Sequence, residues 1–554
     1  HLDPLQSSNI GYLLWMLMGY LVVTAVLVVT FGRLGDIFGR VRMYNAGFAV
    51  FSLASLALSL CPWTGGSGAM WLIVWRVVQG IGGALLTANS AAILTDAFPA
   101  TERGLAVGVS VIAGMAGAFI GLVVGGVLAD VDWRAVFWIN VPIGLFGTVW
   151  AYLKLREVGI RTKARIDWWG NITFGVGLIM ILIGLTYGLM PHGGHSMGWT
   201  GPWVLLELVG GALLLVVFCL IETRVADPMF HLDLFRIRAF AAGNVAGLMA
   251  AIGRGGLQFM LIIWLQGIWL PLHGYSFERT PLWAGIYMLP LTGGFLLAGP
   301  VSGWLSDRYG ARGFATGGML IAATTFGLLM TLPADFTFWI FALLLLLNGI
   351  GTGMFSAPNM TGIMNSAPAS QRGAASGMRA TFQNTGMVLS IGVFFSLMIV
   401  GLSSRLPATM SGGLQANGVP AASAQKIAHL PPVGSLFAAF LGYNPMQKLL
   451  GAPGPNGAPS VLAQLPKRQA AYLTGKTFFP HLISSPFKAG LMIAFTASLV
   501  MSLIAAWASW LRGAKFVHDT SATGAATEPV GAFGEPTEPD APLSAAPEPE
   551  EWTA

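Results

Sequence analysis

The stretch GRLGDIFGRVR, from Gly32 to Arg42, is a short charged connection between two apolar runs that are each long enough to cross a bilayer. Its three arginines predict a cytoplasmic connection, because Lys and Arg beside a span resist translocation. Its glycines allow two helix ends to approach closely, and Asp36 offers a carboxylate to helix N-terminal amides or to a nearby arginine. We therefore take Gly32, Asp36, Gly39 and Arg40 as candidate gating residues.

A second copy of this pattern, GWLSDRYGAR, runs from Gly303 to Arg312. The copies align without a gap at an offset of 271 residues, with four identical pairs: Gly32/Gly303, Leu34/Leu305, Asp36/Asp307 and Gly39/Gly310. Because both copies separate paired apolar runs, the recurrence indicates a duplicated half. Gly303, Asp307 and Arg308 are the candidate gating residues of the second half.

The composition is that of a polytopic membrane protein. The 554 residues are 55% hydrophobic and only 9% charged, whereas soluble domains carry about 25% charged residues. The two cysteines lie in different predicted spans, so no disulfide is expected. Residues 516–554 hold eight acids and no Lys or Arg, so the rest of the chain carries +6 + 8 = +14. This excess favours anchoring against anionic lipid over binding of nucleic acid.

Apolar runs of about 18 residues or more predict thirteen transmembrane helices. The predicted spans are 12–31, 43–61, 70–95, 104–129, 134–153, 168–190, 203–221, 240–270, 281–305, 312–332, 337–364, 372–401 and 488–511. With the turn at Gly32 inside, the inner connections hold 17 Lys and Arg, and the short outer loops hold two. This asymmetry fixes the predicted topology, with a cytoplasmic C-terminus.

The repeated turn follows the second span of the second half but the first visible span of the first half. We therefore expect one further span before the first residue, with a thirteen-span chain as the open alternative. The predicted organisation is an N-terminal helix bundle (1–155), two inserted linker spans (156–235), a C-terminal bundle (236–401 with 488–512), a long outer loop with short amphipathic helices (402–487) and a disordered acidic tail (513–554).

Two further stretches resemble a known family. RVVQGIGGALL carries Arg76, Gln79, Gly80, Gly82 and Ala84 in the fourth-span pattern of the major facilitator superfamily, and WRAVFWINVPIG, from 133 to 144, resembles the sixth-span start of its fourteen-span drug:proton antiporter branch. The resemblance implies an all-α membrane fold of two six-helix bundles plus two linker helices. It also implies a role for Arg76 in proton coupling; the alternative is an arginine that snorkels to the outer face.

Other polar groups also lie inside predicted spans. Arg254 lies about 20 Å from the inner face at about 1.5 Å per residue, and Gln258 follows one turn later. Arg379 is accompanied by Gln383 and Asn384. Together with Gln79 these are the candidate cavity and substrate residues, and the alternative for each is a bond to a neighbouring helix. Apart from Glu207, no Asp or Glu lies within a predicted span, whereas the branch carries its proton-binding Asp in the first span.

The fifth-span stretch GVSVIAGMAGAFIGLVVGG places glycines four residues apart, which makes a groove for close helix packing. It resembles the antiporter pattern G-x-x-x-G-P-x-x-G-G, except that Leu122 replaces the proline, which leaves the direction of transport open. The matching residues are Gly117, Gly121, Gly125 and Gly126.

The resemblance and the composition predict a secondary transporter in the bacterial cytoplasmic (inner) membrane, not an enzyme. We expect it to export hydrophobic or amphipathic drugs or toxic compounds by alternating access, driven by the proton gradient, with no metal or other cofactor. Its expected partners are the cargo, protons and the lipid bilayer, and no nucleic acid. One alternative is export of an anionic lipid or siderophore-like metabolite, favoured by the buried arginines. Another is a non-transporting receptor or scaffold.

Overall fold

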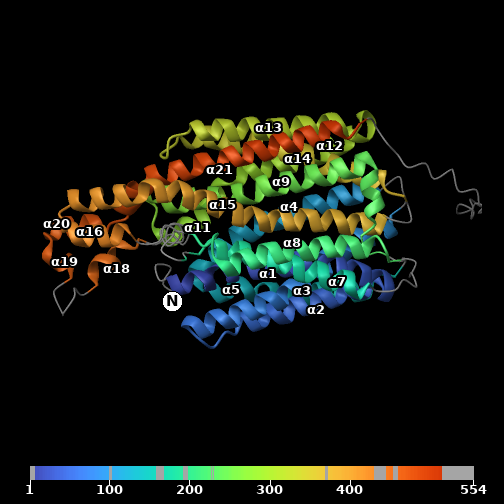
Figure 1. The fold of residues 1–554 in the computed structure, drawn as a ribbon, viewed down its shortest axis with the longest axis horizontal. Helices are drawn as coiled ribbons and strands as arrows, with labels where there is room; N and C mark the ends of the chain where they lie inside the picture. Colours follow the sequence, from blue (N-terminus) through green and yellow to red (C-terminus); the bar gives the residue numbers. More distant parts are fainter. Residues whose placement is uncertain are drawn as a thin grey trace, which may run out of the picture. The chain divides into compact units, whose positions relative to one another are not determined.

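The computed structural model of the chain describes residues 7–98, 103–157, 167–190, 192, 197–225, 228, 230–368, 372–429, 444–452 and 460–513. It is an all-helical membrane protein (Figure 1). The long helices are α1 (Ser7–Phe38), α2 (Arg40–Ser59), α3 (Gly65–Ala97), α4 (Arg103–Val131), α6 (Asn140–Lys154), α7 (Trp168–Gly188), α8 (Pro202–Glu222), α9 (Arg238–Trp264), α12 (Leu289–Tyr309), α13 (Ala311–Thr331), α14 (Phe338–Ser366), α15 (Arg372–Ala416) and α21 (Phe478–Leu511).

Shorter helices connect or extend these. They are α5 (Trp133–Trp138), a 3₁₀ turn η1 (Leu232–Arg236), a π-helical turn η2 (Leu265–Trp269), α10 (Leu270–Leu272), a 3₁₀ turn η3 (Phe277–Arg279), α11 (Thr280–Tyr287), α16 (Ala421–Ala428), α18 (Met446–Gly451), α19 (Val461–Gln464) and α20 (Lys467–Leu473). Within the described residues, twelve helical segments are long and apolar enough to cross a membrane, and they coincide with twelve of the predicted spans. The other predicted span, 104–129, falls on α4, where the apolar stretch is the shorter Ala116–Leu128.

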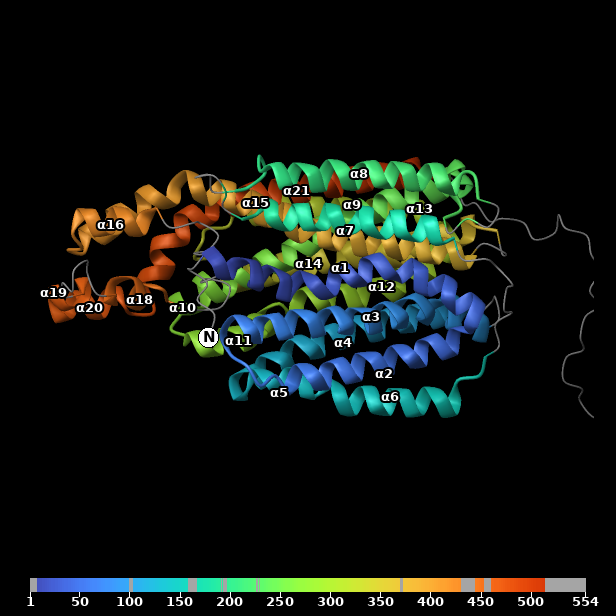
Figure 2. The same ribbon diagram turned by 60° about the horizontal axis from the view of Figure 1, so that its bottom comes forward.

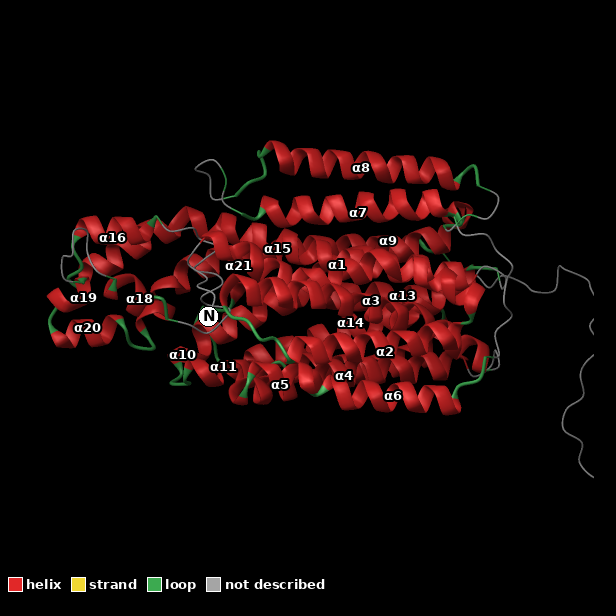
Figure 3. Cartoon of the chain, turned by 90° about the horizontal axis from the view of Figure 1, so that it is seen from below, coloured by secondary structure: helices red, strands yellow, loops and turns green. Residues whose placement is uncertain are grey.

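The helices pack in two groups. In one, α3 lies against α1 and α2, and α6 lies against α2; in the other, α9 contacts α15 and α21, while α14 contacts α12 and α13 (Figure 2). Among the described residues, two seams join the groups: α1 and α3 pack against α15, and α4 packs against α11 and α12. α7 and α8 pack on each other beside these groups, with α7 against α1 and α15 (Figure 3). A space enclosed by both groups is thus bounded by these seams.

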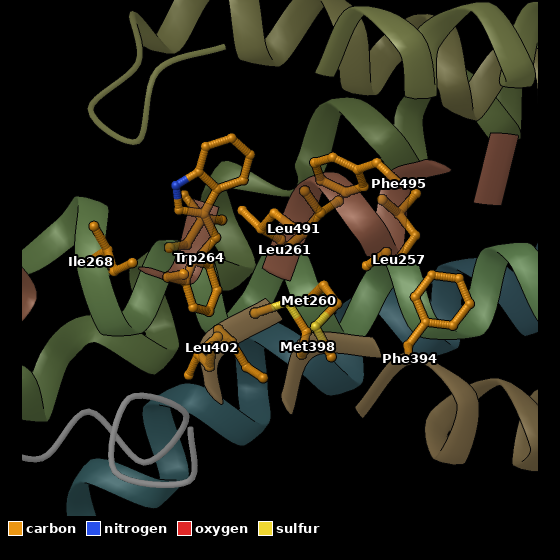
Figure 4. Close-up of a cluster of buried hydrophobic side chains, with 14 of the residues drawn as sticks. Leu257, Met260, Leu261, Trp264, Ile268, Phe394, Met398, Leu402, Leu491 and Phe495 are labelled. Carbon is orange, nitrogen blue, oxygen red and sulfur yellow. The ribbon is translucent and has the colours of Figure 1, made fainter. Parts of the chain in front are cut away.

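Residues with helical spacing form the core of the second group. Leu257, Met260, Leu261 and Trp264 of α9 face Phe394 and Met398 of α15 and Leu491 and Phe495 of α21 (Figure 4). On α8, by contrast, Leu205, Leu206, Val209 and Leu213 are exposed. A contiguous exposed apolar face on a helix this hydrophobic is a lipid-facing surface.

The two repeated turns share one backbone geometry. Gly39 (φ 108°) lies between α1 and α2, and Gly310 (φ 87°) lies between α12 and α13. Side chains disfavour this positive-φ region, so glycine permits a helix to restart directly after the preceding one. In each turn the glycine N–H donates to the carbonyl four residues earlier, Gly35 or Ser306. The sequence repeat is therefore a repeat of backbone structure.

The segment 402–487, predicted as a long outer loop, is helical at both of its ends. α15 continues to Ala416, and α21 already begins at Phe478. Leu402, Leu406, Met410 and Leu414 are at most 3% exposed, and their spacing of four residues buries one face of the extension. The apolar-run criterion missed this helix because polar residues separate those four. Of the short helices expected in the loop, α18 and α20 are present, and residues 435–443 lie outside the described part.

Candidate functional site

A cavity of about 590 Å³ lies between the two helix groups. Its walls come from α2, α3 and α4 on one side and from α9, α12, α13, α14 and α15 on the other. Drug-sized ligands occupy cavities of about 300–1,000 Å³, so this space is large enough for a small organic molecule. Its aromatic lining is Tyr44, Phe48, Phe295, Phe355 and Phe382, and its charged lining is Arg254 and Arg379.

Arg254 projects into the cavity from the middle of α9. On its other side α9 is held against α15, because the Gly256 N–H donates to Ser390 Oγ and Ser390 Oγ donates to the Ile252 carbonyl. The Arg254 guanidinium carbon lies 5.9 Å from the centroid of the Phe295 ring. Within the described part of the chain, Arg254 makes no hydrogen bond and no ion pair. Its donors therefore face the cavity without a protein acceptor.

Arg379 lies at the other end of the cavity. Its NH1 group donates to Gln383 Oε1 at 2.8 Å, and its Nε is buried without an acceptor. Ser390 is level with Arg254, so Arg379, eleven residues earlier on α15, lies about 16 Å away along the helix axis. The two arginines mark opposite ends of one space and do not form a pair.

Three other predicted cavity residues are absent from the lining. Gln383 lines the cavity, but Gln79, Gln258 and Asn384 do not. Gln258 is exposed, and the Asn384 amide nitrogen is buried without an acceptor among the described residues. A residue four positions further on is about 6 Å further along the helix, so Gln258 lies beyond the end of the cavity that Arg254 marks.

Arg76 is bonded within the first helix group and does not line the cavity. Its NH1 donates to Gln79 Oε1 at 2.9 Å, and Gln79 Nε2 donates to Ser55 Oγ at 2.8 Å. Arg76 Nε also reaches the Met16 carbonyl at 3.5 Å, and its guanidinium lies 5.2 Å from the centroid of the Tyr20 ring. Arg76 and Gln79 thus connect α3 to α1 and α2.

The first gating turn contains an ion pair and a capping carboxylate. Arg40 Nε and NH2 both donate to Asp36 Oδ1, at 2.9 and 2.6 Å. Glu157 accepts from the backbone N–H groups of Arg40 and Val41, at 2.8 and 3.1 Å. Its negative charge therefore lies at the N-terminus of α2. Sequence reasoning missed Glu157; the available signal was an acid just after the end of α6, on the predicted cytoplasmic side.

The second gating turn has different side-chain contacts. Arg308 lies over the ring of Trp304, with 4.9 Å to the centroid, and Arg312 lies 3.7 Å from the centroid of the Trp510 ring. The side chain of Asp307 is outside the described residues. Neither turn crowds its first glycine: a Cβ at Gly32 or Gly303 would meet only ordinary contacts, with Ala88 or Ala357.

The fifth-span glycines divide into two kinds. A Cβ at Gly126 would lie 2.9 Å from Leu282 Cα, so α11 packs closely there. At Gly117, Gly121 and Gly125 no described atom lies within 4 Å of the Cβ position. α4 therefore packs closely on α11 at Gly126. Beside Gly117, Gly121 and Gly125 no described atom fills the space. The side chain of Leu122 is outside the described residues.

Arg512 is a third arginine next to the cavity. From the sequence it was counted only among the basic residues that flank the spans. Arg512 is 6% exposed at the end of α21, and it donates to Asn359 Oδ1 and to the Pro358 carbonyl of α14. Asn359 Nδ2 donates to the Gly243 carbonyl of α9 at 3.1 Å, and Asn359 also lines the cavity. These hydrogen bonds join α9, α14 and the end of α21 at one end of the cavity.

Comparisons with known proteins agree with this arrangement. The sequence profile of the Major Facilitator Superfamily matches residues 6–391. The tetracenomycin C resistance and export protein of Streptomyces glaucescens is 31% identical over 503 residues, covering 89% of this chain and 83% of that protein. The methyl viologen resistance protein SmvA of Salmonella typhimurium is 33% identical over 434 residues, covering 76% and 82%. The chain belongs to the major facilitator superfamily of membrane transporters.

Proposed function

We propose that this transporter exports hydrophobic or amphipathic small molecules by alternating access, driven by proton entry. The observation that carries the proposal is the cavity of about 590 Å³ between two helix groups that meet along these two seams. Rocking of one group against the other about these seams opens the cavity to either end in turn. The proposed location is the bacterial cytoplasmic membrane, with the Gly39 and Gly310 turns in the cytoplasm.

The printed names of the relatives support export. One is a resistance and export protein for tetracenomycin C, and another confers resistance to methyl viologen. Both names describe protection from a small toxic molecule, which fits outward transport of a cargo the size of the cavity. For this chain we infer the same class of activity and no particular compound.

In the proposed mechanism the charged turns hold one end of the cavity closed. The Asp36–Arg40 pair and the Glu157 cap fix how α2 leaves α1, so a change at this turn reorients α2, which lines the cavity. We assign proton coupling to Arg76, in keeping with its central place in the network of α1, α2 and α3. Because a guanidinium keeps its proton, its part would be to hold this network in one arrangement while another group carries the proton.

The test is transport by the full chain reconstituted in proteoliposomes. A pH gradient is imposed, and accumulation of a panel of fluorescent amphiphiles (pyrenebutyrate, its neutral amide and ethidium) is followed. The proposal predicts gradient-driven accumulation of at least one compound, abolished by a protonophore and absent from protein-free vesicles. Saturable binding of these compounds without gradient-driven movement of any of them would instead identify a receptor or scaffold with a transporter fold.

A further inference from the structure

We propose that the cavity binds organic acids with an aromatic body, and that Arg254 holds the acidic group. The inference rests on the proposed export function and names its substrate class. It is carried by three features of the described residues: an arginine without a protein acceptor, a cavity lining without an acid, and aromatic rings in that same lining.

The first feature is the set of free donors on Arg254. A guanidinium carries five N–H donors in a planar fork that matches the two oxygens of a carboxylate. Within the described part of the chain, Arg254 has no hydrogen-bond acceptor, and its guanidinium lies over the Phe295 ring at 5.9 Å to the centroid. A ring face satisfies no N–H donor in the plane of the fork. The fork is therefore open toward the cavity.

The second feature is the charge of the lining. The cavity wall contains Arg254 and Arg379, and none of its described residues is Asp or Glu. Its other polar members, among them Asn244, Thr352 and Gln383, are neutral. A positive charge in a poorly hydrated site attracts an anion more strongly than it would in water. The described lining thus favours a negatively charged occupant over a neutral or cationic one.

The third feature is the position of the aromatic rings. Phe295 and Phe355 line the same cavity as Arg254, and both are nearly buried, at 6% and 5% exposed. Planar rings pack against one another in offset or edge-to-face arrangements. A molecule whose acid reaches Arg254 therefore has apolar rings beside it for its aromatic body.

Arg379 is the weaker anion site of the two. Its NH1 already donates to Gln383, and its Nε is buried away from the open space. At about 16 Å from the level of Arg254, it is too far along the helix axis to share one carboxylate with Arg254. The structure assigns the acid contact to Arg254, with a smaller contribution from Arg379 near the opposite end.

The experiment compares three ligands that share a pyrene ring: pyrenebutyrate (anion), pyrenebutyramide (neutral) and pyrenebutylamine (cation). Equilibrium binding is measured by fluorescence with the full chain in lipid nanodiscs. The wild type should bind the anion at least about tenfold more tightly than the amide, because a charge-assisted pair is lost in the amide. Arg254→Gln should abolish this preference, and Arg254→Lys should retain part of it. Arg379→Gln should reduce the preference less than Arg254→Gln does.

The matched control is Arg405→Gln, the same substitution at an exposed arginine on the outer extension of α15. It should keep the full preference for pyrenebutyrate.

If Arg254→Gln does not fold, the test uses Arg254→Lys. This variant keeps the charge, so it should bind the anion more weakly than the wild type does but more tightly than it binds the amide. Equal binding of anion and amide by the wild type, or an undiminished preference in Arg254→Gln, overturns the inference. Failure of the proposed export function is a separate result: no ligand moves with the pH gradient, whatever the binding preference.

Discussion

Arg76 and Arg254 are both guanidinium groups in the middle of an apolar helix, one in each helix group. Arg76 has Gln79 and a carbonyl oxygen as acceptors and a tyrosine ring beside it. Arg254 has only the face of Phe295 among the described residues and projects into the cavity. The same residue type in the same kind of helix thus has two different environments.

The difference separates an arginine that is paired within the protein from one that is open to a ligand. A buried polar group must find a partner, and the partner of Arg76 is the protein itself. The open fork of Arg254 gains acceptors when a ligand supplies them, so removal of the two side chains has different consequences. Loss of Arg76 leaves protein groups unpaired, whereas loss of Arg254 leaves only a larger cavity.

The largest expected effect is on transport. Arg254→Ala should lower the initial rate of export of an acidic cargo at least about tenfold, since charge-assisted hydrogen bonds contribute about 1.5–3 kcal/mol. The measurement is gradient-driven uptake of pyrenebutyrate in proteoliposomes with equal amounts of folded protein. Normal rates across neutral and mildly acidic pH would break the comparison, because Arg254 would then contact neither cargo nor proton-coupling groups.

The next effect is on stability, and here substitution of Arg76 should have the larger effect. Arg76→Leu should destabilise the fold by about 1–3 kcal/mol, because Gln79, which is 1% exposed, loses the donor to its Oε1. Arg254→Leu should leave the melting temperature unchanged or raise it, because an apolar side chain replaces an unpartnered charge. Melting of the two variants in the same nanodiscs measures both. A larger loss in Arg254→Leu would show that Arg254 is the structural arginine.

A smaller effect is expected at the gating turns, where the same sequence pattern has different side-chain contacts. Asp36→Asn weakens the pair with Arg40 and should slow transport severalfold while membrane insertion is kept, because this pair fixes the start of α2. Arg308→Ala should have less effect, since Arg308 is exposed and lies over Trp304. The measurement is the transport rate per inserted molecule. Equal rates in the wild type and Asp36→Asn would remove the gating role of the first turn.

The smallest effect is expected for the cap of α2. The Arg40 and Val41 N–H groups donate to different oxygens of Glu157, so Glu157→Gln, with one acceptor oxygen, removes the charge at the helix N-terminus and one of the two hydrogen bonds. The charge should account for about 0.3–1 kcal/mol of the loss, the usual contribution at a helix N-terminus. Thermal melting at low and high salt checks this, because screening should reduce the difference from the wild type. A difference that salt does not change would mean that the cap acts only through hydrogen bonds.

The sequence was sufficient to predict twelve of the long apolar helices and the repeated turns. Long apolar runs and a glycine flanked by charges are local patterns, and the structure places helices and positive-φ glycines where they occur. The α15 extension was not predicted, because its buried face repeats every fourth residue between polar residues. Local patterns therefore predict which segments are helical, but not how far a helix continues once packing supports it.

The site was only partly predictable. Burial of Arg254 within a span pointed to the cavity, and the structure places it there. Gln258 was expected to share that position, but one helical turn carries it beyond the end of the cavity. Glu157 and Arg512 bind groups on helices far away in the sequence, so no local pattern identifies their partners. Such contacts depend on the tertiary packing.

The most direct test of the account is the thermal shift that saturating pyrenebutyrate gives to the wild type, Arg76→Gln and Arg254→Gln in lipid nanodiscs. Ligand that binds only the folded state raises the melting temperature. We predict that Arg76→Gln melts below the wild type but is stabilised by the ligand as much as the wild type is. Arg254→Gln should melt at or above the wild-type temperature and gain nothing from the ligand. Equal ligand-induced shifts in both variants would contradict the assignment of Arg254 as the residue that binds the cargo.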